Sequence, residues 1–278
     1  MTEAFKTIEG KEEVLKEYQR LAKSTGVIYE EINITTTYGV TYILATGDKN
    51  LPPLILLHGS GINSLMWVNE MNIYKEKYRV YAIDIIGEPG KSDVRQLPLQ
   101  TNDYSLWLKE VFEELEIMKA SLIGISLGAF LITKFAIDNL NMVEKLVLLC
   151  PAGIGNQHKL FLFTSLFYML QGERGLDKLY KKINGDDDIP PEILAYQKLI
   201  AKHFNFRREV IPLLSDYDIC KINVPISLFV GEKDIMLNSK ETALRLKNLL
   251  PHSEINYIEG AGHSIVTFGN DIRKFLEK

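Results

Sequence analysis

Short runs of consecutive apolar residues recur along the chain and alternate with longer segments in which apolar positions repeat every three to four residues. A continuous apolar run is typical of a strand buried on both faces of a parallel sheet, and the longer period is typical of an amphipathic helix. The predicted strands are residues 54–57, 80–86, 122–125, 146–150, 226–230 and 255–258. The predicted helices are residues 65–77, 104–118, 127–140, 239–250 and a terminal helix from Ile265 onward.

The first fifty residues follow a different pattern. An amphipathic helix is predicted over residues 12–23, where Val14, Tyr18 and Leu21 fall on one face. Two extended stretches, residues 28–35 and 40–45, flank a turn and predict an antiparallel hairpin. Strand alternating with helix over the remainder indicates an α/β fold, a mostly parallel sheet with helices on both sides.

Residues 153–210 interrupt this alternation, because they contain no buried-strand run. Two helices are predicted there, an aromatic-rich one over residues 160–170 and another after Pro190 and Pro191. We interpret the segment as a helical cap inserted into an α/β core made of residues 1–152 and 211–278; the alternative is a long crossover. Phe163 and Phe167 then either line an acyl pocket or pack the cap onto the core.

Composition excludes several classes of protein. The 278 residues carry a net charge of −4, which gives no basic footprint for nucleic acid or for an anionic membrane surface. Two cysteines are too few for a disulfide framework, and Cys150 at the end of an apolar run predicts a buried structural thiol. The N-terminus lacks the pattern of a signal peptide, and no apolar stretch reaches the ~20 residues of a membrane span. These features predict a cytoplasmic protein.

The sequence Gly-Ile-Ser-Leu-Gly at residues 124–128 lies between a predicted strand and a predicted helix. A sharp strand-to-helix turn holds its central Ser126 in a strained conformation and exposes the hydroxyl above the sheet. The helix N-terminus beneath the serine favours developing negative charge. Ser126 is therefore the candidate nucleophile, and the alternative is a serine that only caps the helix.

A serine hydroxyl needs a base, and the base needs a carboxylate to orient it. His263 follows a predicted strand within Gly-Ala-Gly-His-Ser, and Asp234 follows another within Gly-Glu-Lys-Asp. Loops at the carboxyl ends of strands are where open α/β sheets bind ligands. Glu232 competes with Asp234 as the acid, and Asp84 is a weaker candidate because it precedes Ser126.

The sequence His-Gly-Ser-Gly at residues 58–61 ends the first buried strand and predicts an oxyanion hole. Its small residues allow backbone amides to approach a substrate oxygen, and we expect the donors to be the amides of Ser60 and Leu127. Gly59 and Gly61 would then lie beside the substrate. His58 is expected to orient this loop, with a second general base as the alternative.

The order of these motifs, with Asp84–Gly87 as a D-x-x-G element, closely resembles the α/β-hydrolase superfamily from about residue 27 to 275. The resemblance implies an eight-stranded sheet, a helical cap after the sixth strand, and an acyl-enzyme mechanism through Ser126, His263 and Asp234 without a cofactor. Small capped bacterial carboxylesterases are the most similar group. Their substrate would be a small-molecule ester; the resemblance does not predict the oligomeric state.

Three further observations concern the loop of residues 84–92, phosphate binding and metal binding. The segment 84–92 is one residue longer than the family pattern D-x-x-G-x-G-x-S, so the shape of its loop is not predicted. A phosphate-binding loop around Lys91 is excluded because position 85 is isoleucine where glycine is required. The scattered histidines, and cysteines without a nearby ligand partner, predict no metal site. The motifs leave open thioester, lactone or C–C hydrolysis, acyl transfer, and a non-catalytic receptor on the same fold.

Overall fold

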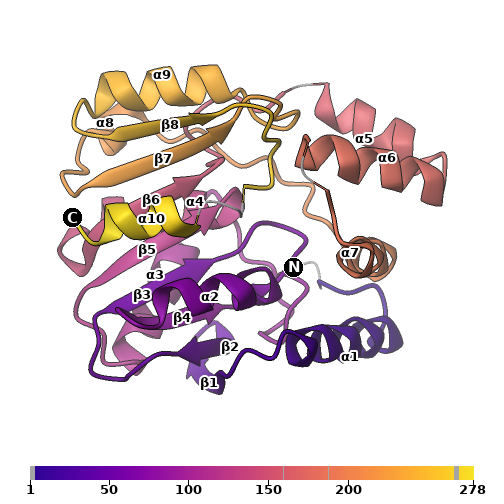
Figure 1. Ribbon diagram of the computed structural model, residues 1–278, viewed down its shortest axis with the longest axis horizontal. Coiled ribbons are helices and arrows are strands. Elements are labelled where there is room, and N and C mark those ends of the chain that lie inside the picture. The colour runs from indigo at the N-terminus through magenta and orange to yellow at the C-terminus, as the bar shows by residue number, and fades with distance from the viewer. Residues whose placement is uncertain (1–3, 159, 187, 266–268) are drawn as a thin grey trace.

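One sheet forms the centre of the computed structural model (Figure 1), which describes residues 4–158, 160–186, 188–265 and 269–278. Within these ranges the sheet has eight strands in the order β1-β2-β4-β3-β5-β6-β7-β8. The strands are β1 (Glu30–Thr36), β2 (Gly39–Thr46), β3 (Pro53–Leu57), β4 (Arg79–Ile83), β5 (Ala120–Ile125), β6 (Val143–Leu149), β7 (Ile226–Gly231) and β8 (Glu254–Ile258). This confirms the predicted fold class.

The direction of the strands sets where a site can form. β2 is antiparallel to β1 and to β4, which confirms the predicted hairpin, and the pairs from β4 through β3 to β8 are parallel. The carboxyl ends of β3, β5, β6, β7 and β8 therefore meet at one edge of the sheet. This edge is where open α/β sheets bind their ligands.

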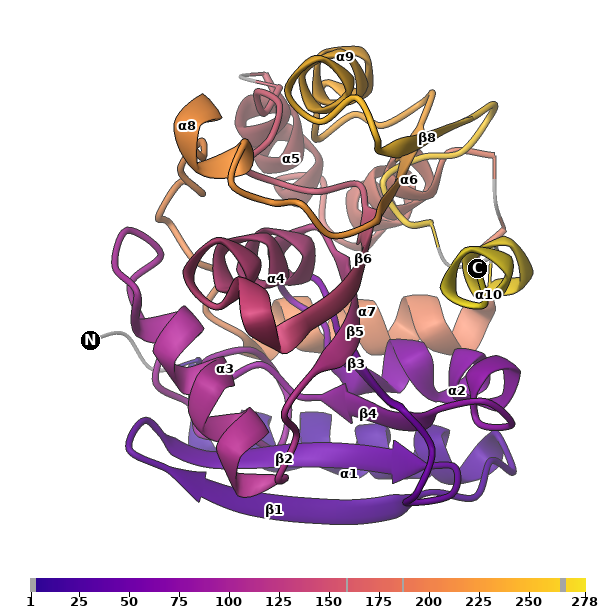
Figure 2. The same cartoon turned by 90° about the vertical axis from the view of Figure 1, so that its left-hand side faces the viewer.

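Helices cover both faces of the sheet. They are α1 (Ile8–Ser24), α2 (Val68–Tyr74), α3 (Asp103–Glu114), α4 (Leu127–Asp138), α5 (Phe161–Met169), α6 (Glu173–Asn184), α7 (Pro191–His203), α8 (Asp216–Ile219), α9 (Ser239–Leu249) and α10 (Gly269–Leu276), with short 3-10 helices at Ser64–Trp67 and Leu140–Met142. Figure 2 shows α3 and α4 on one side of the strands and α2 and α10 on the other.

The continuous apolar runs are explained by two separate cores. Successive residues of a strand point to opposite faces, so Ile55 and Leu57 join the core under α3 and α4, whereas Leu54 and Leu56 join the core under α1, α2 and α10. All four leucine and isoleucine side chains are fully buried. A strand covered on both faces cannot alternate apolar with polar residues, which is why the runs marked the central strands correctly.

Several predicted boundaries differ from the structure, and one helix was missed. The strand expected over residues 80–86 ends at Ile83, because the buried carboxylate of Asp84 accepts hydrogen bonds from the amides of Ser64 and Lys91 and turns the chain into a loop. Helix α6 was not predicted, although Leu176, Leu179 and Ile183 repeat at helical spacing. Of the terminal helix expected from Ile265, residues 266–268 lie outside the described ranges, and α10 begins at Gly269.

The segment 153–210 contributes α5, α6 and α7 between β6 and β7. Figure 1 shows α5 and α6 beyond the sheet on one side of the molecule and α7 next to α1. Tyr196 and Ile200 of α7 are buried in the same core as Val14 and Tyr18 of α1. The role of residues 153–210 as a cap stays a prediction. None of the helices in the described ranges combines the length and the apolar character needed to cross a membrane.

Two leucines of α3 provide a test of the core assignment. Leu108 is buried at 1% exposure, whereas Leu106 on the opposite side of the helix is 50% exposed. We expect Leu108→Ala to lower the free energy of unfolding by about 2–5 kcal/mol, because it removes buried contacts and leaves a cavity. Leu106→Ala should change it by less than about 0.5 kcal/mol. Urea denaturation of both variants measures the difference, and equal losses would contradict the assignment.

Candidate active site

Ser126 occupies the sharp turn between β5 and α4. Its backbone has φ 53° and ψ −110°, and its amide donates to the carbonyl of Leu149 at 2.9 Å. Positive φ is costly for a residue with a side chain and persists only where the surroundings hold it. Ser126 is partly exposed, while Ile125 and Leu127 on either side are buried. Ser126 is thus partly accessible at the carboxyl edge of the sheet.

The two glycines that flank Ser126 are required by close packing. A Cβ on Gly128 would lie 2.3 Å from the carbonyl oxygen of Leu57, and one on Gly124 would lie 2.6 Å from the amide nitrogen of Ala129. Both obstacles are backbone atoms, which cannot rotate away. The helix can therefore start directly behind the strand only with glycine at these positions.

His263 and Asp234 lie in hydrogen-bonding contact. Nδ1 of His263 is 2.7 Å from Oδ2 of Asp234, and the two side chains are 8% and 1% exposed. The amides of Met236 and Leu237 donate to the other carboxylate oxygen at 2.7 and 2.9 Å. Burial by itself would raise the pKa of Asp234, but His263 and these two amides outweigh it and lower that pKa. The carboxylate is held ionised.

The second ring nitrogen of His263 is an open acceptor. The Asp234 carboxylate can only accept a hydrogen bond, so Nδ1 carries the proton and Nε2 of the neutral ring is unprotonated. Nε2 is buried and has no hydrogen-bond partner among the described residues. A buried polar atom without a partner is uncommon and needs an explanation. Nε2 is available to take a proton from a nearby group.

Cys150 lies beside this pair. It follows Leu149, whose carbonyl binds the Ser126 amide, and it has φ 40°. Its sulfur, a carboxylate oxygen of Asp234 and a ring nitrogen of His263 lie within 4.8 Å of one another. The prediction of a buried thiol is confirmed, whereas the expectation that neither cysteine has a nearby ligand partner was wrong. Its position after the β6 run, beside the strand ends that carry Ser126 and Asp234, was the available signal.

The three ligand-type atoms around Cys150 do not favour a metal. A cysteine binds metal as the thiolate, but burial, and next the charge of Asp234, raise the pKa of Cys150 well above its ordinary value. The thiol stays protonated and donates to oxygen acceptors, among them the Gly262 carbonyl at 3.8 Å. The sulfur thereby fills the space between the ends of β6 and β7 beside the acid–histidine pair.

The competing acids are engaged elsewhere. Glu232 is exposed and accepts from the amide of Gly260 at 3.1 Å. Asp84 is fully buried but receives hydrogen bonds from Tyr18, Ser64 and Lys91. Its role is to hold the loops after β3 and β4 together. Of the acidic candidates, only Asp234 contacts the histidine.

The loop after β3 lies against Ser126, since a Cβ on Gly59 would come within 3.6 Å of the Cβ of Ser126. His58 holds this loop with both ring nitrogens: Nδ1 contacts the Gly59 carbonyl at 2.7 Å and Nε2 accepts from the Ile85 amide at 2.9 Å. Burial lowers the pKa of His58, so the ring is neutral. These contacts fit the orienting role, and they leave neither ring nitrogen free to act as a second base.

The two amides predicted to bind an oxyanion are free in the described part of the chain. Neither the amide of Ser60 nor that of Leu127, the first residue of α4, has an acceptor there. The amide of Gly61 is bound by the carboxylate of Glu88 at 2.7 Å. Free donors beside Ser126 are the arrangement that a developing negative charge requires.

The aromatic residues proposed for the substrate pocket are exposed on α5. Phe163 and Phe167 of α5 are 73% and 63% exposed, and the ring of Phe167 packs edge-on against Tyr168. This exposure contradicts the packing of these two rings onto the core, and their part in an acyl pocket stays a prediction. The aromatic composition of this segment does not predict its exposure, because exposure depends on how α5 lies against the rest of the chain.

Known proteins resemble this chain over most of its length. Residues 52–183 match the family model of the alpha/beta hydrolase fold. Carboxylesterase YbfK of Bacillus subtilis is 31% identical over 247 residues, covering 84% of this chain and 81% of its own. The chain belongs to the α/β-hydrolase family. The resemblance inferred from the motifs is confirmed.

Solved structures of bacterial carboxylesterases match the α/β-hydrolase architecture described above. The crystal structure of carboxylesterase CesB (YbfK) from Bacillus subtilis superposes with a TM-score of 0.86 at 27% identity, covering 97% of this chain and 99% of that one. Naproxen esterase from the same organism gives a TM-score of 0.82 at 26% identity, covering 94% and 97%. The match includes residues 153–210, since it extends over almost the whole chain.

The lowered pKa of Asp234 predicts a pH dependence of stability. A carboxyl group with a lowered pKa in the folded chain stabilises the fold above its unfolded pKa, about 3.9, and loses this contribution as the pH falls through the folded pKa. We expect the stability advantage of the wild type over Asp234→Asn to shrink as the pH falls below about 4. Urea denaturation between neutral pH and about pH 2.5 measures it, and an advantage that grows toward acid would refute the assignment.

Proposed function

We propose that the protein is a serine carboxylesterase that cleaves small-molecule esters through an acyl-enzyme. The observation that carries the proposal is the Asp234–His263 contact of 2.7 Å, which leaves Nε2 of His263 as a buried open acceptor at the sheet edge that also carries Ser126. The relatives named carboxylesterases support ester hydrolysis. No other side chain of the site is needed as a base.

In the first half of the reaction, Oγ of Ser126 attacks the ester carbonyl carbon while Nε2 of His263 takes the hydroxyl proton. The ring then carries a positive charge, which the ionised Asp234 stabilises through Nδ1. The carbonyl oxygen becomes an oxyanion that the free amides of Ser60 and Leu127 bind. When the tetrahedral intermediate collapses, the C–O bond breaks and His263 returns the proton to the departing alcohol.

In the second half, water replaces the alcohol. His263 takes a proton from water as the oxygen attacks the acyl carbon, and the same two amides stabilise the second oxyanion. Collapse breaks the bond to Ser126, which regains its proton from His263, and the acid leaves. The cycle needs these side chains, two amides and water.

Residues 153–210 have the place of a cap in this proposal. They enter after β6 and return before β7, so they are carried by the ends of strands that lie next to the site. Gly59 and Gly61 would lie along the substrate on the core side. The surface between residues 153–210 and the core would determine which acyl and alcohol groups fit.

Ser126→Ala tests the nucleophile. We expect it to abolish covalent labelling by a fluorophosphonate probe and to lower the hydrolysis of short-chain p-nitrophenyl esters by several orders of magnitude, because no acyl-enzyme can form. Turnover is followed by p-nitrophenol release, and labelling by fluorescence on a gel. A folded wild type with neither labelling nor turnover would instead support a non-catalytic receptor.

His263→Ala tests the base, with His252→Ala as its matched control. His252 is exposed and contacts only the carbonyl of Val224, at 3.2 Å, among the described residues. We expect His263→Ala to lower ester turnover by several orders of magnitude and His252→Ala to leave it unchanged. Near-normal turnover in folded His263→Ala would rule out the mechanism. A panel of esters, thioesters, lactones and C–C substrates then identifies the preferred bond.

A further inference from the structure

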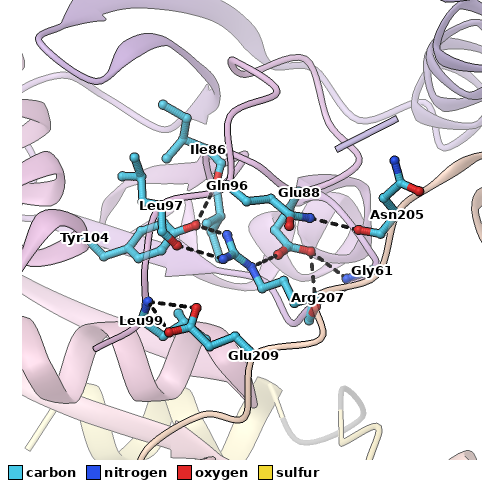
Figure 3. Close-up of polar contacts among 12 residues, drawn as sticks. Gly61, Ile86, Glu88, Gln96, Leu97, Leu99, Tyr104, Asn205, Arg207 and Glu209 are labelled. Atoms are coloured by element: carbon cyan, nitrogen blue, oxygen red, sulfur yellow. Dashed lines mark hydrogen bonds and ion pairs between the residues drawn. The ribbon is translucent and has the colours of Figure 1, made fainter. Parts of the chain in front are cut away.

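Glu88 is a fully buried carboxylate that the proposed reaction does not use. It lies in the segment 84–92, where the sequence is one residue longer than the family pattern. A buried carboxylate must be paired and hydrogen-bonded to remain in the fold. Figure 3 shows that its partners come from two parts of the chain that are far apart in sequence.

One oxygen of Glu88 binds the loop that carries the predicted oxyanion donor. Oε2 accepts from the amide of Gly61 at 2.7 Å and from the hydroxyl of Ser60 at 3.3 Å. The carboxylate therefore contacts both residues that follow Gly59. The Gly61 amide is occupied, whereas the Ser60 amide has no acceptor among the described residues and can bind a substrate oxygen.

The other oxygen of Glu88 binds Arg207, which belongs to the segment that returns from α7 toward β7. Nε of Arg207 donates to Oε1 at 2.9 Å, and the arginine side chain is 7% exposed. Its remaining donors are bound by the carbonyl of Leu97, at 2.8 Å, and the hydroxyl of Tyr104. The guanidinium also lies over the ring of Tyr104, 5.3 Å from its centre.

The residue before Arg207 reaches the same loop. Gly61 has φ 71°, and a Cβ there would lie 2.4 Å from the ring of Phe206. Phe206 packs edge-on against Phe204, which is buried. The loop after β3 is thus held on one side by the Glu88 carboxylate and covered on another by the segment that carries Arg207.

We propose that Glu88 and Arg207 form a positioning pair that fixes residues 59–61 so that the Ser60 amide points at the developing oxyanion. The proposal rests on the carboxylesterase function proposed above. Neither side chain touches the reacting atoms. Glu88 acts through the loop, and Arg207 acts through Glu88 by supplying the charge and hydrogen bond that keep the buried carboxylate in place.

The size of the effect follows from what an oxyanion donor contributes. Removing one such donor costs roughly a hundred- to a thousandfold in turnover, and a displacement of about 1 Å can cost a hundredfold. The interaction strengthens as charge develops on the oxygen, so misplacing the amide lowers kcat more than it weakens substrate binding. A purely structural pair would lower stability without separating kcat from KM.

Glu88→Gln tests the pair. We expect kcat for p-nitrophenyl esters to fall about ten- to a hundredfold, with KM within about threefold, because the neutral amide holds the loop less firmly. Affinity for a trifluoromethyl ketone, whose carbonyl oxygen becomes an alkoxide when Ser126 adds to it, should fall by a similar factor. The Ser60 amide binds the negatively charged alkoxide more strongly than the uncharged carbonyl oxygen of a bound ester. Displacing the amide therefore weakens ketone binding more than ester binding.

A matched control comes from the same return segment. Glu209 accepts from the amide of Leu99 at 3.1 Å with both carboxylate oxygens and has no contact with residues 59–61. Glu209→Gln should leave kcat and ketone affinity within twofold of the wild type. Arg207→Lys, which keeps the charge but loses the planar donor set, should give a loss smaller than that of Arg207→Met.

Single variants leave one buried charge unpaired and can unfold the chain. The double variant Glu88→Gln with Arg207→Met removes both charges, and it should fold and show the lowered kcat and ketone affinity. If the folded variants keep wild-type kcat and ketone affinity, the positioning role is wrong while the esterase stands. If wild-type protein neither turns over esters nor labels at Ser126, the proposed function fails and this inference fails with it.

Discussion

The buried carboxylate of Asp234 is the constraint on which the candidate site depends. A carboxylate removed from water destabilises the fold unless charge and hydrogen bonds replace its hydration. Here the Met236 and Leu237 amides and the ring of His263 do so, which fixes the loops after β7 and β8 against each other. The same chemistry recurs on the other side of Ser126, where backbone amides bind the buried carboxylates of Asp84 and Glu88. Buried carboxylates therefore organise the loops along this edge of the sheet.

The parts of the fold that were predictable from sequence are those dictated by burial along one element. Leu54 to Leu57 face two cores in turn, so their pattern carries the information that the strand is central. The boundaries that failed depend on distant contacts. Ile85 and Ile86 are as apolar as a strand and are fully buried, but Asp84 binds the amide of Ser64 and directs the chain into a loop. Helix α6 was missed because its regularly spaced apolar residues lie among many charged residues.

The residues of the candidate site also separate into those that the sequence predicts and those that depend on distant contacts. Ser126, Asp234 and His263 could be named because each follows a strand within a short motif whose glycines have a steric reason, such as Gly128 against the Leu57 carbonyl. Arg207 has no such local motif, and Cys150 has only its position after the β6 run, since their contacts form when strands and loops meet in space. The exposure of Phe163 and Phe167 could not be predicted, because composition reports that a ring is apolar and says nothing about what covers it.

The longer segment 84–92 carries Glu88, on which the proposed positioning pair depends. Its turn is tight: the Gly90 amide donates to the Glu88 carbonyl at 2.7 Å, and a Cβ on Gly90 would lie 2.5 Å from the carboxylate of Asp84. Asn63 donates to the Pro89 carbonyl at 2.7 Å, so both ends of the turn are anchored. From this turn the Glu88 side chain reaches both the loop after β3 and the return segment with Arg207. A departure from the family motif thus lies where the fold connects residues 59–61 to the segment that follows α7.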